Sequence, residues 1–159
     1  MAEYRGPVSE RAAAIRDLFK GAGVACTAID SLAQARWEKL VWNVPFNGLG
    51  VAAGHADSAA VLHDDELTRT ARELMREVIA GARSEGVTID PAFEQKMIDA
   101  TPSMQAYKSS MQIDYEMGRP LEVEAILGEP VRRARAAGIP VPKMEMLYAI
   151  VRRLDALQR

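Results

Sequence analysis

Three polar side chains are spaced at intervals of one helical turn within an apolar segment near residue 40. Lys39, Asn43 and Asn47 stand at positions i, i+4 and i+8, so a continuous helix would place them on one face. Asparagine offers both a donor and an acceptor, which suit a hydroxyl or carbonyl ligand. A partly desolvated lysine can serve as a general acid. The pattern is compatible with a polar strip facing a pocket, whereas spacing alone favours a structural strip that caps helix ends or binds water.

A second group of polar residues follows further along the chain. Ser109-Ser110-Met111 precedes the turn Gly118-Arg119-Pro120, which leads to Glu122 and Glu124. Serine residues commonly start helices, and carboxylates are favoured in the first turn of a helix by its dipole. Taken alone, these residues are explained by helix capping as well as by ligand binding.

The elements that position these residues are predicted to be helices. The chain is rich in good helix formers, and alternating runs of β-branched and aromatic residues are almost absent. Proline is expected to disturb two of the helices, at Pro45 and Pro130, because it lacks a backbone N–H. The predicted helices after Asp30 cover residues 30–44, 64–86, 90–101, 109–117, 122–137 and 144–157.

The first 29 residues have a different predicted secondary structure from the rest of the chain. Ser9 can cap a helix that reaches Lys20, and short extended segments are predicted at residues 3–4 and 24–28. A lone pair of strands is marginal in stability, and no later segment offers strands to pair with them. These residues are therefore expected either to pack on the helices or to belong to a larger sheet.

Composition excludes several classes of protein. A chain of 159 residues with one cysteine, Cys26, is not a disulfide-stabilised scaffold. The net charge of −2 argues against a nucleic-acid partner, and no apolar run approaches the length of a membrane span. The chain starts without the features of a signal peptide, so we expect a cytoplasmic protein. No metal site is expected, because the spacing of the residues between His55 and Asp65 matches no known ligand pattern.

Four segments taken together, in this order, resemble the C-terminal domain of the 2-dehydropantoate 2-reductase (ketopantoate reductase) family. They are Trp37–Asn47, Ser109–Met111, Gly118–Glu122 and Gly138–Pro142. The resemblance implies a mainly α, multi-helix fold with a short strand–helix–strand remnant at the N-terminus. Residues 1–29 would be the end of a dinucleotide-binding domain, and residues 30–159 an all-helical substrate-binding and dimerisation domain.

The resemblance also implies roles for individual residues in an NADPH-dependent reduction of ketopantoate to pantoate, a step of pantothenate biosynthesis. Lys39 would protonate the carbonyl oxygen of the substrate as hydride arrives. Asn43 and Asn47 would hold the hydroxyl end of the substrate, and Ser110 would contact its carboxylate. Glu122 would lie beside Lys39 and the nicotinamide ribose, as a catalytic and cofactor-binding residue.

This sequence departs from the family pattern at Pro45, Gly48, Leu127 and Pro130, so a related 2-keto acid is also a possible substrate. A Rossmann phosphate-binding turn needs a strand, a G-x-G-x-x-G turn and a helix. Residues 48–53 match the sequence G-x-G-x-x-A, but they follow a predicted helix and not a strand, so they are not expected to form such a turn. We therefore expect the chain to need a Rossmann domain or a separate partner, to bind NADPH weakly alone, and to be inactive alone.

An alternative interpretation is a non-catalytic helical module that serves only in dimerisation or interaction. The apolar face formed by Leu74, Val78 and Ile79 would then be its functional surface. Both interpretations include a homodimer.

Overall fold

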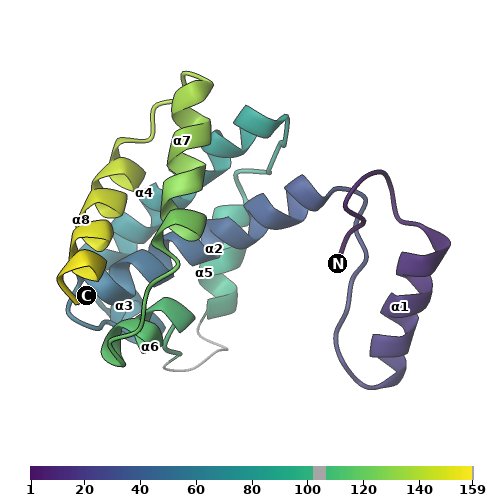
Figure 1. Ribbon diagram of the computed structural model, residues 1–159, viewed down its shortest axis with the longest axis horizontal. Coiled ribbons are helices and arrows are strands. Elements are labelled where there is room, and N and C mark those ends of the chain that lie inside the picture. The colour runs from purple at the N-terminus through teal and green to yellow at the C-terminus, as the bar shows by residue number, and fades with distance from the viewer. Residues whose placement is uncertain (102–106, 159) are drawn as a thin grey trace.

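The computed structural model describes residues 1–101 and 107–158 (Figure 1). Its α-helices are α1 (Glu10–Gly21), α2 (Leu32–Ala52), α3 (Ser58–His63), α4 (Asp65–Gly81), α5 (Phe93–Ala100), α6 (Ser110–Glu116), α7 (Glu129–Ala136) and α8 (Pro142–Gln158). A 3₁₀ turn, η1 (Ala82–Glu85), follows α4, and a π-helical turn, η3 (Glu124–Gly128), precedes α7. The prediction of a mainly α fold is confirmed.

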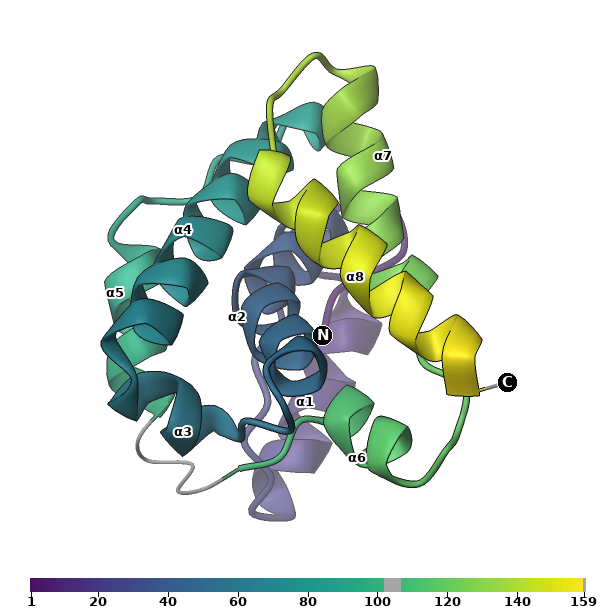
Figure 2. The ribbon, with the colours of Figure 1, turned by 90° about the vertical axis from the view of Figure 1, so that its left-hand side faces the viewer.

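Helix α2 is the central element of the helical domain. Figure 2 shows it running through the middle of the other helices, and it packs against α4, α6 and α8. Trp37, Val41 and Val44 are buried on one side of its first half, whereas every residue from Val44 to Val51 is buried in its second half. A helix that is buried all round needs apolar or small residues on every face. Its sequence supplies them through Leu49 and the glycines at 48 and 50.

Helix α4 contributes its apolar face to the core rather than to the surface. Leu74, Val78 and Ile79 are all buried. The alternative interpretation expected this face to be the surface used in dimerisation or interaction. That expectation is wrong, because the face packs within this chain.

Prolines 45 and 130 have different effects. Helix α2 continues through Pro45, where a kink was predicted, and remains helical to Ala52. Pro130 lies in the first turn of α7, directly after the π-helical turn η3, in which the Glu129 N–H donates to the Glu124 carbonyl. The predicted interruption at Pro130 therefore takes the form of a change from π-helical to α-helical hydrogen bonding, while the backbone stays helical on both sides. Helix α3 was not predicted; Asp57 caps it by accepting a hydrogen bond of 2.8 Å from the Ala60 N–H.

The N-terminal segment keeps its predicted helix but not its strands. Ser9 caps α1 as expected, and its Oγ accepts from the Ala12 N–H at 3.1 Å. No residue of 1–101 or 107–158 forms a β-strand, so the strands predicted at 3–4 and 24–28 are wrong. Two backbone hydrogen bonds nevertheless join the ends of this segment, from the Met1 nitrogen to the Thr27 carbonyl (2.6 Å) and from the Ile29 N–H to the Met1 carbonyl (3.0 Å). In Figure 1, α1 stands apart from the other helices.

Gly48 allows α2 and α8 to approach closely. A Cβ atom at this position would lie 2.8 Å from Cγ of Leu147, which is buried in α8. We expect Gly48→Val to lower the free energy of unfolding by about 1–3 kcal/mol, because the core must be overpacked or the helices must separate. Urea unfolding followed by circular dichroism would measure the change.

The matched control for this prediction is Gly21→Val in α1. A Cβ at Gly21 has no neighbour within 4 Å, so we expect a change of less than about 0.5 kcal/mol. Equal effects at the two positions would contradict the role of close packing at Gly48.

Glu94 ties α5 to α4 through a largely buried carboxylate. Arg72 Nη1 lies 2.9 Å from its Oε1, and Arg76 Nε lies 2.7 Å from its Oε2. Burial raises the pKa of Glu94, but the hydrogen bonds and charges of Arg76 and Arg72 together outweigh burial and lower the pKa below its ordinary value of 4.5. The ionised carboxylate is therefore the form that the fold stabilises.

Because the pKa of Glu94 is lower in the folded chain than in the unfolded chain, its contribution to stability is complete above the unfolded value. That contribution is lost as the pH falls through the folded pKa. At neutral pH we expect Glu94→Gln to be less stable than the wild type by about 1–3 kcal/mol, and the difference to shrink in acid as the pH falls through the lowered pKa of Glu94. Urea unfolding at neutral pH and at the lowest pH at which the chain still folds checks this. Glu66→Gln, at an exposed ion pair, should change stability little at either pH, and a pH-independent effect of Glu94→Gln would contradict the prediction.

Candidate active site

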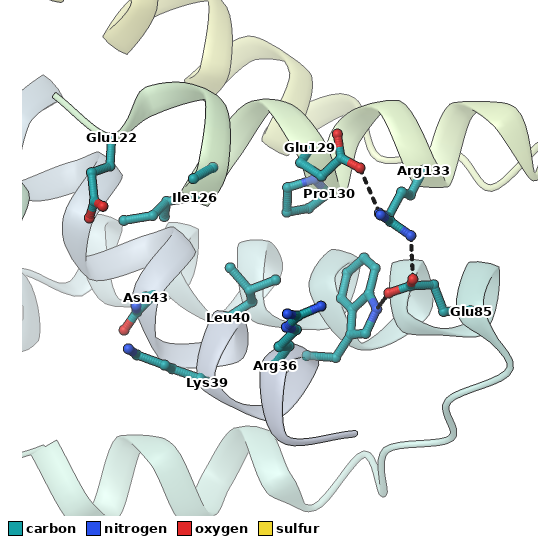
Figure 3. A pocket seen from close by; sticks show the side chains of 12 residues that line it. Arg36, Lys39, Leu40, Asn43, Glu85, Glu122, Ile126, Glu129, Pro130 and Arg133 are labelled. Atoms are coloured by element: carbon teal, nitrogen blue, oxygen red, sulfur yellow. Dashed lines mark hydrogen bonds and ion pairs between the residues drawn. The ribbon is translucent and has the colours of Figure 1, made fainter. Parts of the chain in front are cut away.

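A groove of about 390 Å³ separates the first half of α2 from η3 and α7 (Figure 3). Its floor is largely apolar, with Trp37 and Leu40 on one side and Ile126 and Pro130 on the other. The remaining lining residues are polar or small, namely Arg36, Lys39, Asn43, Glu85, Glu122, Ala125, Glu129 and Arg133. The groove thus combines apolar walls with a few polar groups, which is the usual make-up of a small-molecule site.

Lys39, Asn43 and Glu122 line one end of this groove. Lys39 and Asn43 come from successive turns of α2, and Glu122 comes from the segment just before η3. Figure 3 shows the Lys39 amine beside the Asn43 amide, with Glu122 at the same end on the opposite wall. Lys39 and Glu122 are exposed, and Asn43 is half-buried. In the described part of the chain, none of the three side chains has a hydrogen-bond or ion-pair partner, so all three are available to a ligand.

The other end of the groove is held by a chain of paired charges. The indole Nε1 of Trp37 donates to Glu85 Oε2 at 2.7 Å, and Arg133 pairs with both Glu85 and Glu129. The hydrogen bond from Arg132 is the largest effect that holds the pKa of Glu129 below its ordinary value, and the charge of Arg133 adds to it. These contacts join α2, η1 and α7, and they fix the groove wall that Trp37 forms.

Sequence reasoning missed Arg36, Trp37 and the Glu85–Arg133 pair as lining residues. Arg36 stands three residues before Lys39, so helical spacing could have indicated that it shares the face of the strip. It lines the groove and has no ion-pair partner among the residues that the structure describes. The Glu85–Arg133 pair joins positions 48 residues apart, so no local sequence pattern could predict it.

Asn47, the third residue of the strip, is placed elsewhere. It does not line the groove, and only 2% of its surface is exposed. Its Nδ2 donates to the Asn43 carbonyl at 3.0 Å, and its Oδ1 accepts from the Met111 N–H at 3.2 Å. Both functional groups of the amide are therefore bonded within the chain, and the continuous strip predicted from spacing faces a pocket only at Lys39 and Asn43.

Ser110 is the first residue of α6 and is exposed. It does not line the groove, and it reaches the strip only through its neighbour Met111, which is bonded to Asn47. Ser109 is the helix cap, since its Oγ accepts from the Gln112 N–H at 3.2 Å. The capping explanation is thus correct for the first serine, whereas the second is left free to face solvent or a ligand.

The glycine-containing segment at residues 48–53 is not a phosphate-binding turn. Residues 48–52 lie within α2, and Gly48 and Gly50 are buried there. Within residues 1–101 and 107–158, no helix combines the length and hydropathy needed to cross a membrane.

Comparison with known proteins identifies relatives of the chain. The family model described as "Ketopantoate reductase PanE/ApbA C terminal" matches residues 31–155. A 2-dehydropantoate 2-reductase from Nostoc sp. is 41% identical over 153 residues, which are 96% of this chain and 47% of the relative. The enzyme of the same name from Halobacterium salinarum is 30% identical and is matched over 94% of this chain and 49% of its own length.

Solved structures show the same fold. The 2-dehydropantoate 2-reductase of Methylococcus capsulatus aligns with a TM-score of 0.91 at 35% identity, over 99% of this chain and 50% of that one. The enzyme of Geobacter metallireducens gives 0.88 at 38% identity, over 95% and 50% of the two chains. This chain thus spans about half the length of the relatives that it matches. It belongs to the ketopantoate reductase family and corresponds to the C-terminal helical domain of that family.

Proposed function

We propose that the chain is the substrate-binding half of an NADPH-dependent reductase of 2-keto acids, with 2-dehydropantoate as its substrate. The observation that carries this proposal is that Lys39, Asn43 and Glu122, all without partners in the described chain, line the same end of a partly apolar groove. The names of the relatives support the choice of substrate.

The groove suits the reduction of a carbonyl group. Addition of hydride to a ketone carbon leaves negative charge on the oxygen, and a cation next to that oxygen stabilises the transition state most where water is excluded. Lys39 is the cation at this site, and its ammonium group would donate the proton that completes the alcohol. Asn43, one turn further along α2, would hydrogen-bond a hydroxyl group of the substrate. Ser110 would contact the carboxylate from the start of α6.

The cofactor would be held mainly outside the described helices. NADPH supplies the hydride when bound, and a dinucleotide normally lies against a glycine-rich turn between a strand and a helix. No such turn occurs in residues 1–101 or 107–158. Glu122 fits the edge of the cofactor, because its exposed carboxylate can accept hydrogen bonds from ribose hydroxyl groups.

We therefore propose that a Rossmann domain, joined to this chain or separate, completes the site, and that the chain is inactive without it. Residues 1–29 would be the end of that domain, and residues 30–159 the helical domain. The hydrogen bonds between Met1 and residues 27–29 support this division, because they follow the pattern of parallel pairing on the two sides of a helix. The helical domain is also proposed to form a homodimer, which analytical ultracentrifugation would detect.

A chimera tests the proposal directly. In it, this chain replaces the matching half of the Nostoc sp. 2-dehydropantoate 2-reductase, whose own N-terminal half is kept. We expect oxidation of NADPH that depends on 2-dehydropantoate, and none from either half alone. A folded chimera that binds NADPH but reduces neither 2-dehydropantoate nor related 2-keto acids would refute the proposal.

A further inference from the structure

Asn47 connects the two parts of the chain that carry the proposed substrate contacts. Its Nδ2 donates to the main-chain carbonyl of Asn43, and its Oδ1 accepts from the main-chain N–H of Met111, the residue after Ser110. Asn43 is on the central helix, whereas Ser110 begins α6, more than 60 residues further along the chain. One buried side chain is thus bonded to the backbone beside each of these two residues.

The burial of Asn47 leaves no surface for a ligand. With 2% of the residue exposed and both amide groups bonded, contact with a substrate would require two internal hydrogen bonds to break. Breaking them would leave the Met111 N–H buried without an acceptor, which is costly. Asparagine suits this buried position because its amide carries a donor and an acceptor on two separate atoms and has no charge.

The bond to Met111 is also what fixes the start of α6. The N–H groups in the first turn of a helix have no acceptor within the helix. Ser109 accepts from the Gln112 N–H, and Asn47 accepts from the Met111 N–H, so the turn that carries Ser110 is held from both sides. Since α6 has seven residues, it contributes few hydrogen bonds of its own to keep this turn in place.

From this geometry we infer that Asn47 is a positioning residue, which sets the spacing between Asn43 and Ser110 and does not touch the substrate. The inference deepens the proposed function and rests on the proposed function for the identity of the substrate. The hydrogen bonds by which Asn47 joins α2 to α6 are present in the chain whatever its substrate is.

The first test needs no substrate. Amide hydrogen exchange of the intact chain, resolved by NMR, is compared for the wild type, Asn47→Leu and Asn47→Asp. We expect Asn47→Leu to speed the exchange of the Met111 amide about tenfold or more. Asn47→Asp keeps an oxygen acceptor in place and should restore much of the protection. Unchanged exchange of Met111 in folded Asn47→Leu would overturn the inference.

The second test separates positioning from direct contact in the chimera. We expect Asn47→Leu to raise KM for the 2-keto acid about tenfold with little change in KM for NADPH. The factor should be the same for 2-dehydropantoate and its analogue without the hydroxyl group. In a Ser110→Ala background the added effect of Asn47→Leu should be smaller, because the two residues act through one element.

A direct contact gives the opposite pattern. If Asn47 bound the hydroxyl group, Asn47→Leu would abolish the preference for 2-dehydropantoate over the analogue, and its effect would add fully to that of Ser110→Ala. That result would overturn the inference. An inactive wild-type chimera would refute the proposed function alone, because the exchange of Met111 still decides whether Asn47 holds α6.

Discussion

Replacing Lys39 by methionine is expected to lower kcat/KM for the 2-keto acid about 10²–10⁴-fold in the chimera, which is the usual contribution of a positioned general acid. Methionine keeps the length and the apolar part of the side chain, so the wall of the groove should stay in place. The change removes the cation that stands beside Asn43 at the proposed reaction site. Steady-state oxidation of NADPH at varied 2-keto acid would measure the effect.

The control for this prediction is Lys96→Met. Lys96 is also exposed but lies in α5, outside the groove, so activity should not change. Lys39→Met should unfold at the same urea concentration as the wild type, because Lys39 has no hydrogen-bond or ion-pair partner among the described residues. Near-normal turnover in Lys39→Met would remove Lys39 from the mechanism.

The part of the site that could be predicted from the sequence is the part that one helix builds by itself. Lys39 and Asn43 share a face because an α-helix repeats every 3.6 residues, and the structure keeps that relation. Asn47 satisfies the same spacing, yet its surroundings are set by α6, whose Met111 lies 64 residues away in sequence. Spacing along one helix cannot tell which of its turns another element will cover.

The errors in the fold have a similar origin. Residues 24–28 have the composition of a strand, but a strand also needs a neighbouring strand to share its hydrogen bonds. Within the part of the chain that the structure describes, the pairing across this segment is limited to the two backbone hydrogen bonds of Met1. Pro45 was expected to kink α2, and the glycines after it were expected to loosen the chain. The packing that surrounds the helix from Val44 to Val51 keeps it helical to Ala52. In both cases tertiary contacts, or their absence, decided an outcome that local preference could not.

Trp37 couples the stability of the core to the shape of the groove. Its indole is 1% exposed, packs against Gly81 at the end of α4, and donates to Glu85. We expect Trp37→Ala to lower the free energy of unfolding by about 3–5 kcal/mol, because it leaves a large cavity beneath the groove. Urea unfolding followed by circular dichroism is the suitable measurement, since the substitution also removes one of the two tryptophans and so changes the fluorescence signal.

Trp37→Phe separates the two contributions of this side chain. Phenylalanine keeps an aromatic ring in the core but cannot donate to Glu85, which retains its ion pair with Arg133. We therefore expect a smaller loss of about 1–2 kcal/mol. If both variants lost the same free energy, the hydrogen bond to Glu85 and not the filling of the core would be the main contribution of Trp37. A loss below about 1 kcal/mol in Trp37→Ala would show that the groove wall collapses to fill the cavity.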